Sequence, residues 1–327
     1  MRSGFVSILG RPNAGKSTLI NALVGEKVAI VTSKPQTTRS RIHGIVDIPA
    51  VKGKHHAAQI VFVDTPGVHK PGSMLDKRMM QEVHDALAQR DIVLLIIDAT
   101  RRIEIDDPKS EDTFVFELIK KVDCPVFLII NKIDLVDREK LLPLIAQLSA
   151  LYPFAEVFPI SARKRDGLER LTEKLIEHLP EGQRYFPKDQ FTDQPERFLV
   201  AELIRERILM ETGEEVPYAS AVVIERFEEP EPAKGDRLPL TRIAAAIYCE
   251  RTGQKAILIG KGGSKLKSIG TSARKEIESL LGTRVFLELH VIVKENWRES
   301  QGFVEALDWR RQIAEMGEAQ KQREEED

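Results

Sequence analysis

The sequence predicts an α/β domain with a mostly parallel sheet and helices on both faces, followed by a smaller α+β domain. Three observations carry this prediction. Apolar runs of strand length alternate with helical patterns in the first half of the chain, and most of these runs end at a polar residue. The order of elements changes after residue 180. The length of 327 residues also suits two domains.

The strands expected in the first half are short apolar runs. They cover residues 5–9, 60–63, 92–97, 126–130 and 157–160. Amphipathic spacing predicts helices over residues 17–23 and 168–179. The runs end at Gly10, Asp64, Asp98, Asn131 and Ser161. Ligands of open α/β sheets bind at the carboxyl ends of the strands, so this edge is the expected binding site.

The second half begins after a proline-rich stretch with few aliphatic residues. Residues 181–196 are predicted to be a linker between a first domain, 1–180, and a second, 197–300. The second domain is expected to contain a helix over 198–210, strands over 219–227 and 242–251, a glycine turn, a helix over 265–281 and a strand over 285–293. Residues 301–327 are expected to form a C-terminal helix and an acidic tail that frays.

Composition excludes several classes of protein. No run of about 18 apolar residues predicts a membrane helix, and the N-terminus lacks the pattern of a signal peptide. Two distant cysteines make a disulfide scaffold and a cysteine zinc site improbable, which suits a reducing cytosol. The net charge is 49 − 51 = −2, yet residues 251–275 hold seven Lys or Arg and no acidic residue. This basic segment predicts a local anion site.

Residues 10–17, GRPNAGKS, match the phosphate-binding pattern G-x-x-x-x-G-K-[ST] between an expected strand and an expected helix. The glycines let backbone N–H groups approach phosphates, and the start of the helix adds its dipole. Lys16 would contact the outer phosphates and Ser17 would bind Mg²⁺. The phosphate-binding residues predicted here are Gly10, Asn13, Ala14, Gly15, Lys16, Ser17 and Thr18.

Two further motifs follow later strands. Asp64-Thr65-Pro66-Gly67 would hold Mg²⁺ through water at Asp64 and sense the γ-phosphate at the N–H of Gly67. The same four residues also make a good turn. Asn131, Lys132 and Asp134 follow the strand at 126–130. A carboxylate at Asp134 can accept both hydrogen bonds from guanine, which adenine does not offer, so GTP is favoured over ATP.

The segment Ser161-Ala162-Arg163 offers a backbone N–H for the guanine carbonyl. With these motifs in order, the chain resembles the translation-factor-type GTPases. The resemblance implies a switch threonine in Gln36-Thr37-Thr38-Arg39. Thr38 would bind Mg²⁺, with Thr37 as the alternative. Lys16, Thr38 and Gly67 are then the expected catalytic residues.

Val68 occupies the position where many GTPases carry a glutamine that orients water. Valine cannot do this by hydrogen bonding, so hydrolysis is expected to be slow without help. His69 is interpreted as an ordinary loop histidine. In relatives with the same phosphate loop, an asparagine at the position of Asn13 helps to hold K⁺. The resemblance therefore implies K⁺ as a second cation.

The second domain carries a G-x-x-G loop, Gly260-Lys261-Gly262-Gly263, before an expected helix. Such loops let the backbone approach a sugar–phosphate chain, as in KH domains. Lys265 and Lys267 add charge, and residues 257–259, Leu266 and Ile269 would form an apolar floor for bases. A plain helical turn or a small-anion site are the other interpretations.

The order of elements in the second domain fits a type II KH fold. The whole chain resembles a family of bacterial GTPases with a C-terminal KH domain. That resemblance implies a monomer that binds GTP and GDP with Mg²⁺. It also implies binding to the 3′ end of 16S rRNA, assistance in 30S subunit maturation, and a cytoplasmic location with peripheral contact to the inner membrane. A second domain that docks a protein or a membrane is the alternative, which the net charge of −5 over residues 181–327 favours.

Two segments depart from the family pattern. The loop at 49–58 is longer than usual, and its His55 and His56 are expected to face solvent. The hairpin at 226–237 is rich in Glu and Pro.

Overall fold

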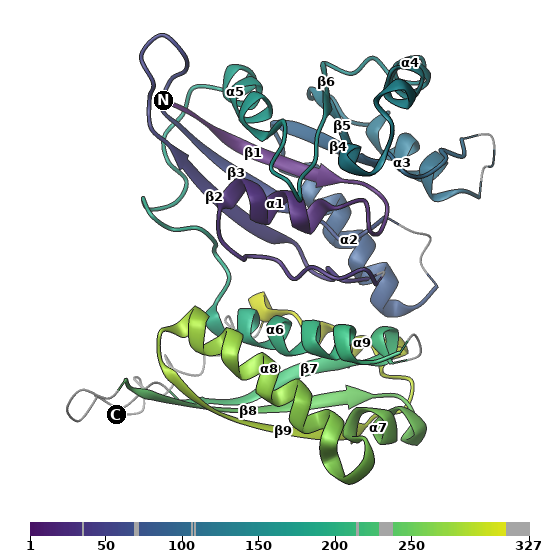
Figure 1. Ribbon diagram of the computed structural model, residues 1–327, viewed down its shortest axis with the longest axis vertical. Coiled ribbons are helices and arrows are strands. Elements are labelled where there is room, and N and C mark those ends of the chain that lie inside the picture. Colours follow the sequence, from purple (N-terminus) through teal and green to yellow (C-terminus); the bar gives the residue numbers. More distant parts are fainter. Residues whose placement is uncertain are drawn as a thin grey trace. The chain divides into compact units, whose positions relative to one another are not determined.

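The computed structural model describes residues 1–34, 36–68, 72–105, 107, 109–213, 216–228 and 238–311 (Figure 1). The chain divides into two compact units. The first contains Met1–Pro71 and Met79–Asp193, and the second contains Gly72–Arg78 and Gln194–Asp327. The domain limits expected from the sequence stay a prediction. His69, most of the 226–237 hairpin and the acidic tail lie outside the described residues.

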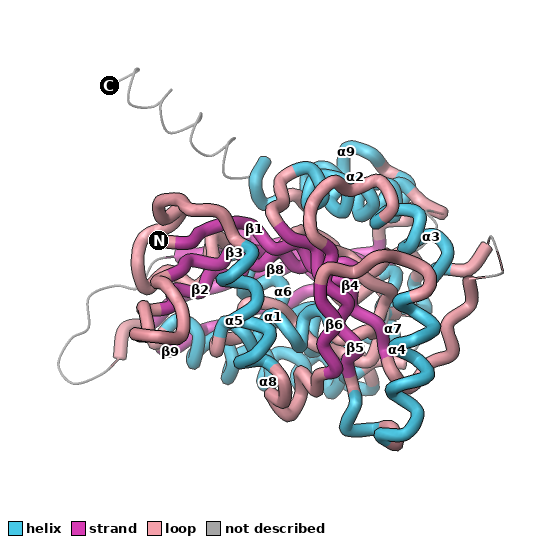
Figure 2. The backbone as a smooth tube through the Cα atoms, turned by 90° about the horizontal axis from the view of Figure 1, so that it is seen from above, coloured by secondary structure: helices cyan, strands magenta, loops and turns pink. Residues whose placement is uncertain are grey.

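The first unit is built on a six-stranded sheet with the order β2-β3-β1-β4-β5-β6, drawn in magenta in Figure 2. Its strands are β1 (Arg2–Leu9), β2 (Ile42–Ile48), β3 (Ala58–Asp64), β4 (Ile92–Asp98), β5 (Val126–Asn131) and β6 (Glu156–Pro159). The edge strand β2 is antiparallel to β3, and every other pairing is parallel. The predicted, mostly parallel α/β fold is confirmed.

Helices cover both faces of this sheet. On one face lie α2 (Met74–Ala88), α3 (Glu111–Ile119) and α4 (Leu141–Ser149). They pack on every second residue of β4 and β5, the ones whose side chains point to that face. That shared core includes Val83, Phe116, Leu148, Leu95 and Leu128. On the other face lie α1 (Lys16–Val24) and α5 (Leu168–His178). There the rings of Phe127 and His178 meet at 5.0 Å.

The proline-rich segment up to residue 193 is bonded to the first unit. The side chain of Gln59 on β3 is fully buried; its Oε1 accepts hydrogen bonds from the N–H groups of Tyr185 and Phe186 at 2.7 and 3.0 Å. The N–H of Ile45 on β2 donates to the carbonyl of Phe191 at 2.9 Å. This segment therefore contacts both β3 and the edge strand β2, and it pairs the N–H of Ile45, a backbone group that an edge strand would leave without a partner strand.

The second unit is a three-stranded sheet packed against helices, with the order β7-β8-β9. Strand β8 is antiparallel to β7 and parallel to β9. The elements are α6 (Glu196–Glu211), β7 (Ala221–Glu228), β8 (Leu240–Cys249), α7 (Thr252–Ile259), α8 (Ser264–Leu281), β9 (Arg284–Val293) and α9 (Gln301–Ala306). The core joins α6 and α8 to the sheet through residues such as Ile204, Ile269 and Ile247.

Helix α7 corrects the sequence prediction, which placed the glycine turn directly after the β8 strand. Within this helix the apolar residues do not share one surface. Leu258 is fully buried in the core and Ile257 is 42% exposed, because consecutive helical positions point in different directions. Ile269 is also fully buried. The expected apolar floor for bases is therefore wrong for Leu258 and Ile269.

Among the described residues, no helix is both long enough and apolar enough to span a membrane.

Candidate functional site

A cleft of about 500 Å³ opens at the carboxyl ends of the parallel strands of the first unit. This volume suits a small organic ligand. Most predicted nucleotide-binding residues line the cleft: Asn13, Gly15, Lys16, Ser17, Thr18, Thr38, Gly67, Asn131, Lys132, Asp134, Ser161 and Arg163. Gly10, Ala14, Asp64, Thr65, Pro66 and Ala162 are buried and do not line the cleft. The roles given to all of these residues stay predictions.

The phosphate loop holds Lys16 in a defined position. Gly15 has φ 102°, a left-handed conformation that a side chain would strain, and a Cβ there would meet the amide nitrogen of Asn131 at 2.2 Å. The ammonium of Lys16 donates to the carbonyls of Gly10 at 3.1 Å and Arg11 at 2.9 Å. Burial lowers its pKa to about 8, although the charges of Asp64 and Glu111 oppose this shift.

Three side chains that could bind a metal ion through oxygen lie in contact beside the phosphate loop. The hydroxyl of Ser17 donates to Asp64 Oδ2 at 2.8 Å, the hydroxyl of Thr38 donates to the same oxygen at 3.2 Å, and the two hydroxyls lie 2.9 Å apart. Burial raises the pKa of Asp64. Its Oδ1 is buried and has no hydrogen-bond partner in the described part of the chain. Hard oxygen ligands beside an unsatisfied carboxylate fit Mg²⁺.

Thr37 lies apart from this group, because its hydroxyl pairs with Thr32 at 2.8 Å and donates to the carbonyl of Lys34 at 2.6 Å. Of the two candidate switch threonines, the structure brings Thr38 to the predicted metal ligands.

The Asp64–Gly67 motif presents only its glycine to the cleft. Thr65 is buried and donates its hydroxyl to the carbonyl of Ile8 at 2.7 Å. A Cβ on Gly67 would meet Pro12 Cα at 2.8 Å, so the close contact between this motif and the phosphate loop requires glycine. Val68 is fully buried in the core with α2 and α3. Its side chain therefore packs away from any water in the cleft.

Asn131 joins two loops. Its amide nitrogen donates to the carbonyl of Ala14 at 2.9 Å, and its Oδ1 accepts from the N–H of Ala162 at 3.0 Å. The Ala162 N–H, a candidate donor to guanine, is thus bonded to protein here. Lys132 has φ 67° and donates from Nζ to the carbonyl of Asn13 at 2.8 Å.

Asp134 is half-buried and lines the cleft. The hydroxyl of Ser161 donates to its Oδ1 at 2.7 Å, and this hydrogen bond lowers the pKa of Asp134. An ionised carboxylate that Ser161 orients through one hydrogen bond still has acceptor positions for the paired N–H groups of guanine.

Sequence reasoning missed two contributors to the site. Asp98 Oδ2 accepts from Lys132 Nζ at 2.6 Å and so fixes that side chain; its position at the end of β4 was the available signal. The segment 30–33 lines the cleft, and the carbonyl of Ser33 accepts from the Asn13 amide at 2.7 Å. Nothing in the residue types of this segment indicated that contact.

The glycine loop of the second unit lies at the start of α8. Gly260, Gly262 and Gly263 have φ values of 71°, 58° and 78°, which glycine adopts without strain. A Cβ on Gly260 would meet the backbone nitrogen of Lys265 at 2.9 Å, whereas Gly262 and Gly263 face open space. Lys261 and Lys267 are exposed, and Lys265 is half-buried. The loop thus presents bare backbone and positive charge to solvent.

Fold and site together define a phosphate-loop GTPase followed by a KH domain. Two family models match, one described as "50S ribosome-binding GTPase" over residues 5–132 and one described as "KH domain" over residues 215–298. GTPase Era of Geotalea uraniireducens is 50% identical over 299 residues, which cover 91% of this chain and 95% of the relative. GTPase Era of Heliobacterium modesticaldum is 46% identical over 94% of this chain and 99% of the relative. The chain belongs to the Era family of GTPases.

Two solved structures agree with this assignment. A variant of Aquifex aeolicus Era bound to GDP·AlF4⁻ has a TM-score of 0.84 and 39% identity, and covers 93% of this chain and 98% of its own. Era in complex with MgGDPNP and nucleotides 1506–1542 of 16S ribosomal RNA has a TM-score of 0.85 and 40% identity over the same shares. The predicted type of enzyme, a GTPase, is confirmed.

Proposed function

We propose that this GTPase binds the 3′ end of 16S rRNA through its KH domain and assists maturation of the 30S subunit. The observation that carries the proposal is the glycine loop, whose Gly262 exposes backbone between Lys261 and Lys265. Bare backbone admits a sugar–phosphate chain at close range, and the lysines neutralise its phosphates. The rRNA complex of the Era relative supports the same assignment.

For the nucleotide site, we propose that Ser17 and Thr38 bind Mg²⁺ and that Asp64 holds it through water, since the three lie within 3.2 Å of one another. The ion would neutralise phosphate charge. Lys16 offers its remaining N–H bond to the phosphates, and the backbone of Gly67 borders the same end of the cleft. Guanine is selected at the open side of Asp134.

Hydrolysis by this chain alone is proposed to be slow, because the buried side chain of Val68 cannot orient the attacking water. We propose that K⁺ beside Asn13 contributes positive charge that an arginine finger would otherwise supply. The bond from the Asn13 amide to the Ser33 carbonyl supports this, since it brings a second oxygen-rich segment to the phosphate loop.

On the family resemblance alone, we propose that the protein is a monomer of the cytoplasm with peripheral contact to the inner membrane. A second candidate function is that the KH unit docks a protein or a membrane. The net charge of −5 over residues 181–327 favours that candidate, and the uninterrupted basic segment at 251–275 opposes it.

The test is fluorescence anisotropy of a labelled 16S 3′-end RNA with the full-length protein at two salt concentrations. A scrambled RNA of equal length is the control. We expect the 3′-end RNA to bind more tightly than the scrambled one, with an affinity that falls as salt rises, because phosphate contacts release counterions. RNA affinity is also compared in GDP and in a non-hydrolysable GTP analogue, and we expect the two to differ. Absence of RNA binding at either salt would favour the docking function.

A further inference from the structure

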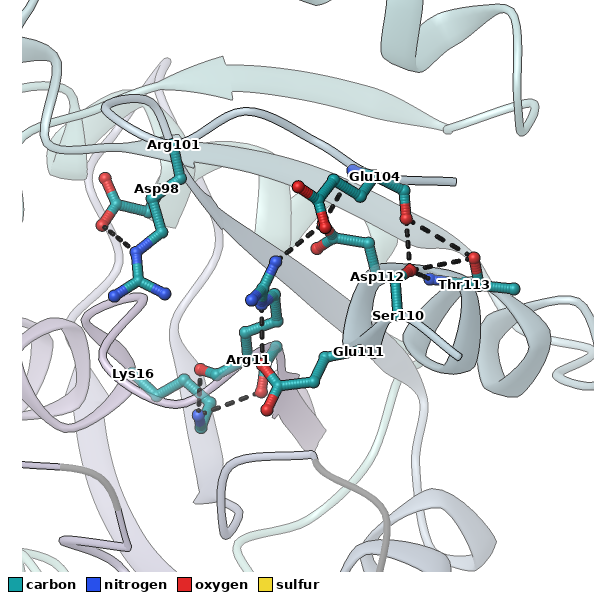
Figure 3. A network of polar contacts seen from close by, with 10 residues as sticks. Arg11, Lys16, Asp98, Arg101, Glu104, Ser110, Glu111, Asp112 and Thr113 are labelled. Atoms are coloured by element: carbon teal, nitrogen blue, oxygen red, sulfur yellow. Dashed lines mark hydrogen bonds and ion pairs between the residues drawn. The ribbon is translucent and has the colours of Figure 1, made fainter. Parts of the chain in front are cut away.

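Arg11, the second residue of the phosphate loop, turns its side chain toward the start of α3 (Figure 3). Its Nε donates to Glu111 at 2.8 Å and its Nη1 donates to Asp112 at 2.8 Å. The Asp112 side chain is only 4% exposed, and its Oδ2 also accepts from the backbone N–H of Glu104 at 3.0 Å. One guanidinium therefore ties the phosphate loop to a helix about 100 residues away in sequence.

The start of α3 is a firm anchor for that guanidinium. Ser110 caps the helix by accepting from the N–H of Thr113 at 3.0 Å. Glu111 and Asp112 lie in the first turn, where the helix dipole stabilises negative charge. Two carboxylates on one helical turn match the planar fork of N–H groups on a guanidinium. A lysine ammonium is a point charge and does not offer this geometry.

The contact between Arg11 and α3 involves the same stretch of backbone that orients Lys16. The carbonyls of Gly10 and Arg11 accept two of the three N–H bonds of the Lys16 ammonium. The backbone of Gly10 lies close to β4, since a Cβ there would meet the carbonyl oxygen of Ile96 at 2.5 Å, and the Gly10 carbonyl accepts from the N–H of Val68 at 3.2 Å. The Arg11 carbonyl also accepts from the N–H of Ala14 at 3.4 Å, a contact within the loop, whereas the side chain of Arg11 supplies the contact to α3.

We propose that Arg11 is a positioning residue for GTP binding: its ion pairs with Glu111 and Asp112 hold the phosphate loop in the shape that aims Lys16 at the phosphates. This inference rests on the role proposed for Lys16 and not on RNA binding, so nucleotide alone tests it.

The charges around this contact separate positioning from simple attraction. If Arg11 acted only as a positive charge near an anionic nucleotide, removing the negative charge of Asp112 would tighten nucleotide binding. If the pair positions the loop, losing either partner weakens binding. The two accounts therefore predict opposite signs for Asp112→Ala.

The experiment measures dissociation of a fluorescent GDP, together with KM and kcat for GTP, in the full-length protein. We expect Arg11→Met and Asp112→Ala each to speed GDP dissociation and to raise KM by about tenfold. A tenfold change corresponds to about 1.4 kcal/mol, roughly the contribution of one charge-assisted hydrogen bond. We expect kcat to change by less than about twofold, because bound phosphates reorient Lys16 once GTP is in place. Arg11→Lys, which keeps one ion pair, should recover part of the loss.

The matched control is Arg184→Met, which removes an arginine–aspartate pair of equal length, 2.8 Å to Asp47, from a position that does not line the cleft. It should leave the nucleotide parameters unchanged. The double variant Arg11→Met/Asp112→Ala should be no weaker than the weaker single variant. Tighter GDP binding in Asp112→Ala, additive losses in the double variant, or an equal loss in Arg184→Met would overturn the proposal. If Arg11→Met does not fold, Asp112→Ala and Arg11→Lys decide the question.

Discussion

The hydroxyl oxygens of Ser17 and Thr38 lie 2.9 Å apart, although the two residues are 21 positions apart in the chain. Both also contact one carboxylate oxygen of Asp64. The phosphate loop, the segment before β2 and the end of β3 thus contribute one oxygen donor each to a single point. A nucleotide-bound cation at that point would be sensed by the segment that carries Thr38, which is the requirement for a switch.

The first prediction separates the two neighbouring threonines. Thr38→Ala should lower the rate of GTP hydrolysis by about tenfold or more, since a hydrogen bond to a charged group is worth about 1.5–3 kcal/mol. Thr37→Ala is the matched control, because its hydroxyl bonds to Thr32 and Lys34 instead of Asp64. Hydrolysis is measured as phosphate release over a range of Mg²⁺ concentrations. An equal effect of the two substitutions would show that the assignment of Thr38 is wrong.

Asp134→Asn should change the preferred base from guanine to xanthine. The amide replaces a double acceptor by one acceptor and one donor, which complements xanthine better. The change is measured by letting GTP or XTP compete with a fluorescent GDP for the protein. Ser161→Ala is the companion variant, because it removes the 2.7 Å hydrogen bond to Asp134. It should weaken GTP binding by about fivefold without altering the preference for guanine over xanthine. Continued preference of Asp134→Asn for GTP would refute the role.

Hydrolysis should be severalfold faster in potassium than in sodium at equal ionic strength. The physical reason is that the chain has no water-orienting side chain at Val68, so an added positive charge beside the phosphates has a large effect. Asn13→Ala should remove the difference between the two salts. Phosphate release in matched KCl and NaCl buffers is the measurement, and equal rates for the wild-type protein would rule out the potassium site.

In the second unit, Lys261→Ala should weaken binding of all RNA sequences by a similar factor. A phosphate contact positions the strand without reading bases. The slope of log affinity against log salt should become shallower by about 0.7–1. Titrations with the 3′-end RNA and a scrambled RNA at several salt concentrations supply both numbers. A loss confined to one RNA sequence would mean that Lys261 reads a base.

Much of the fold was predictable because its strands are continuous apolar runs. The buried strands β4 and β5 coincide with such runs almost residue for residue. The edge strand β2 was missed because His43, Gly44 and Asp47 interrupt its apolar residues. Helix α7 was missed because it is short, carries Gly253 in its first turn and buries only Leu258. Its stability comes from packing on the rest of the second unit, which no local pattern records.

The site was predictable where a motif names both the residue and its chemistry. Phosphate-loop residues such as Lys16, and Asp134 at the far end, were found in this way. Contacts between distant segments were not. The bond from Asp98 to Lys132 and the ion pairs of Arg11 depend on how β4 and α3 pack beside the phosphate loop. Such pairs are properties of the folded chain, since residue types alone do not say which charges meet.

If this GTPase binds RNA through its glycine loop, as we claim, Gly262→Asp should lose RNA affinity. Gly262 faces open space at φ 58°, a conformation that Asp tolerates, so the variant should fold and place a negative side chain against the RNA backbone. Gly282→Asp is the matched control, with φ 64° and open space at the other end of α8.

We expect RNA affinity, measured by fluorescence anisotropy, to fall by at least about tenfold in Gly262→Asp, which corresponds to about 1.4 kcal/mol. Affinity should be nearly unchanged in Gly282→Asp, and GTP binding should be intact in both variants. RNA affinity equal to wild type in folded Gly262→Asp protein would contradict the claim and favour a docking role for the second unit.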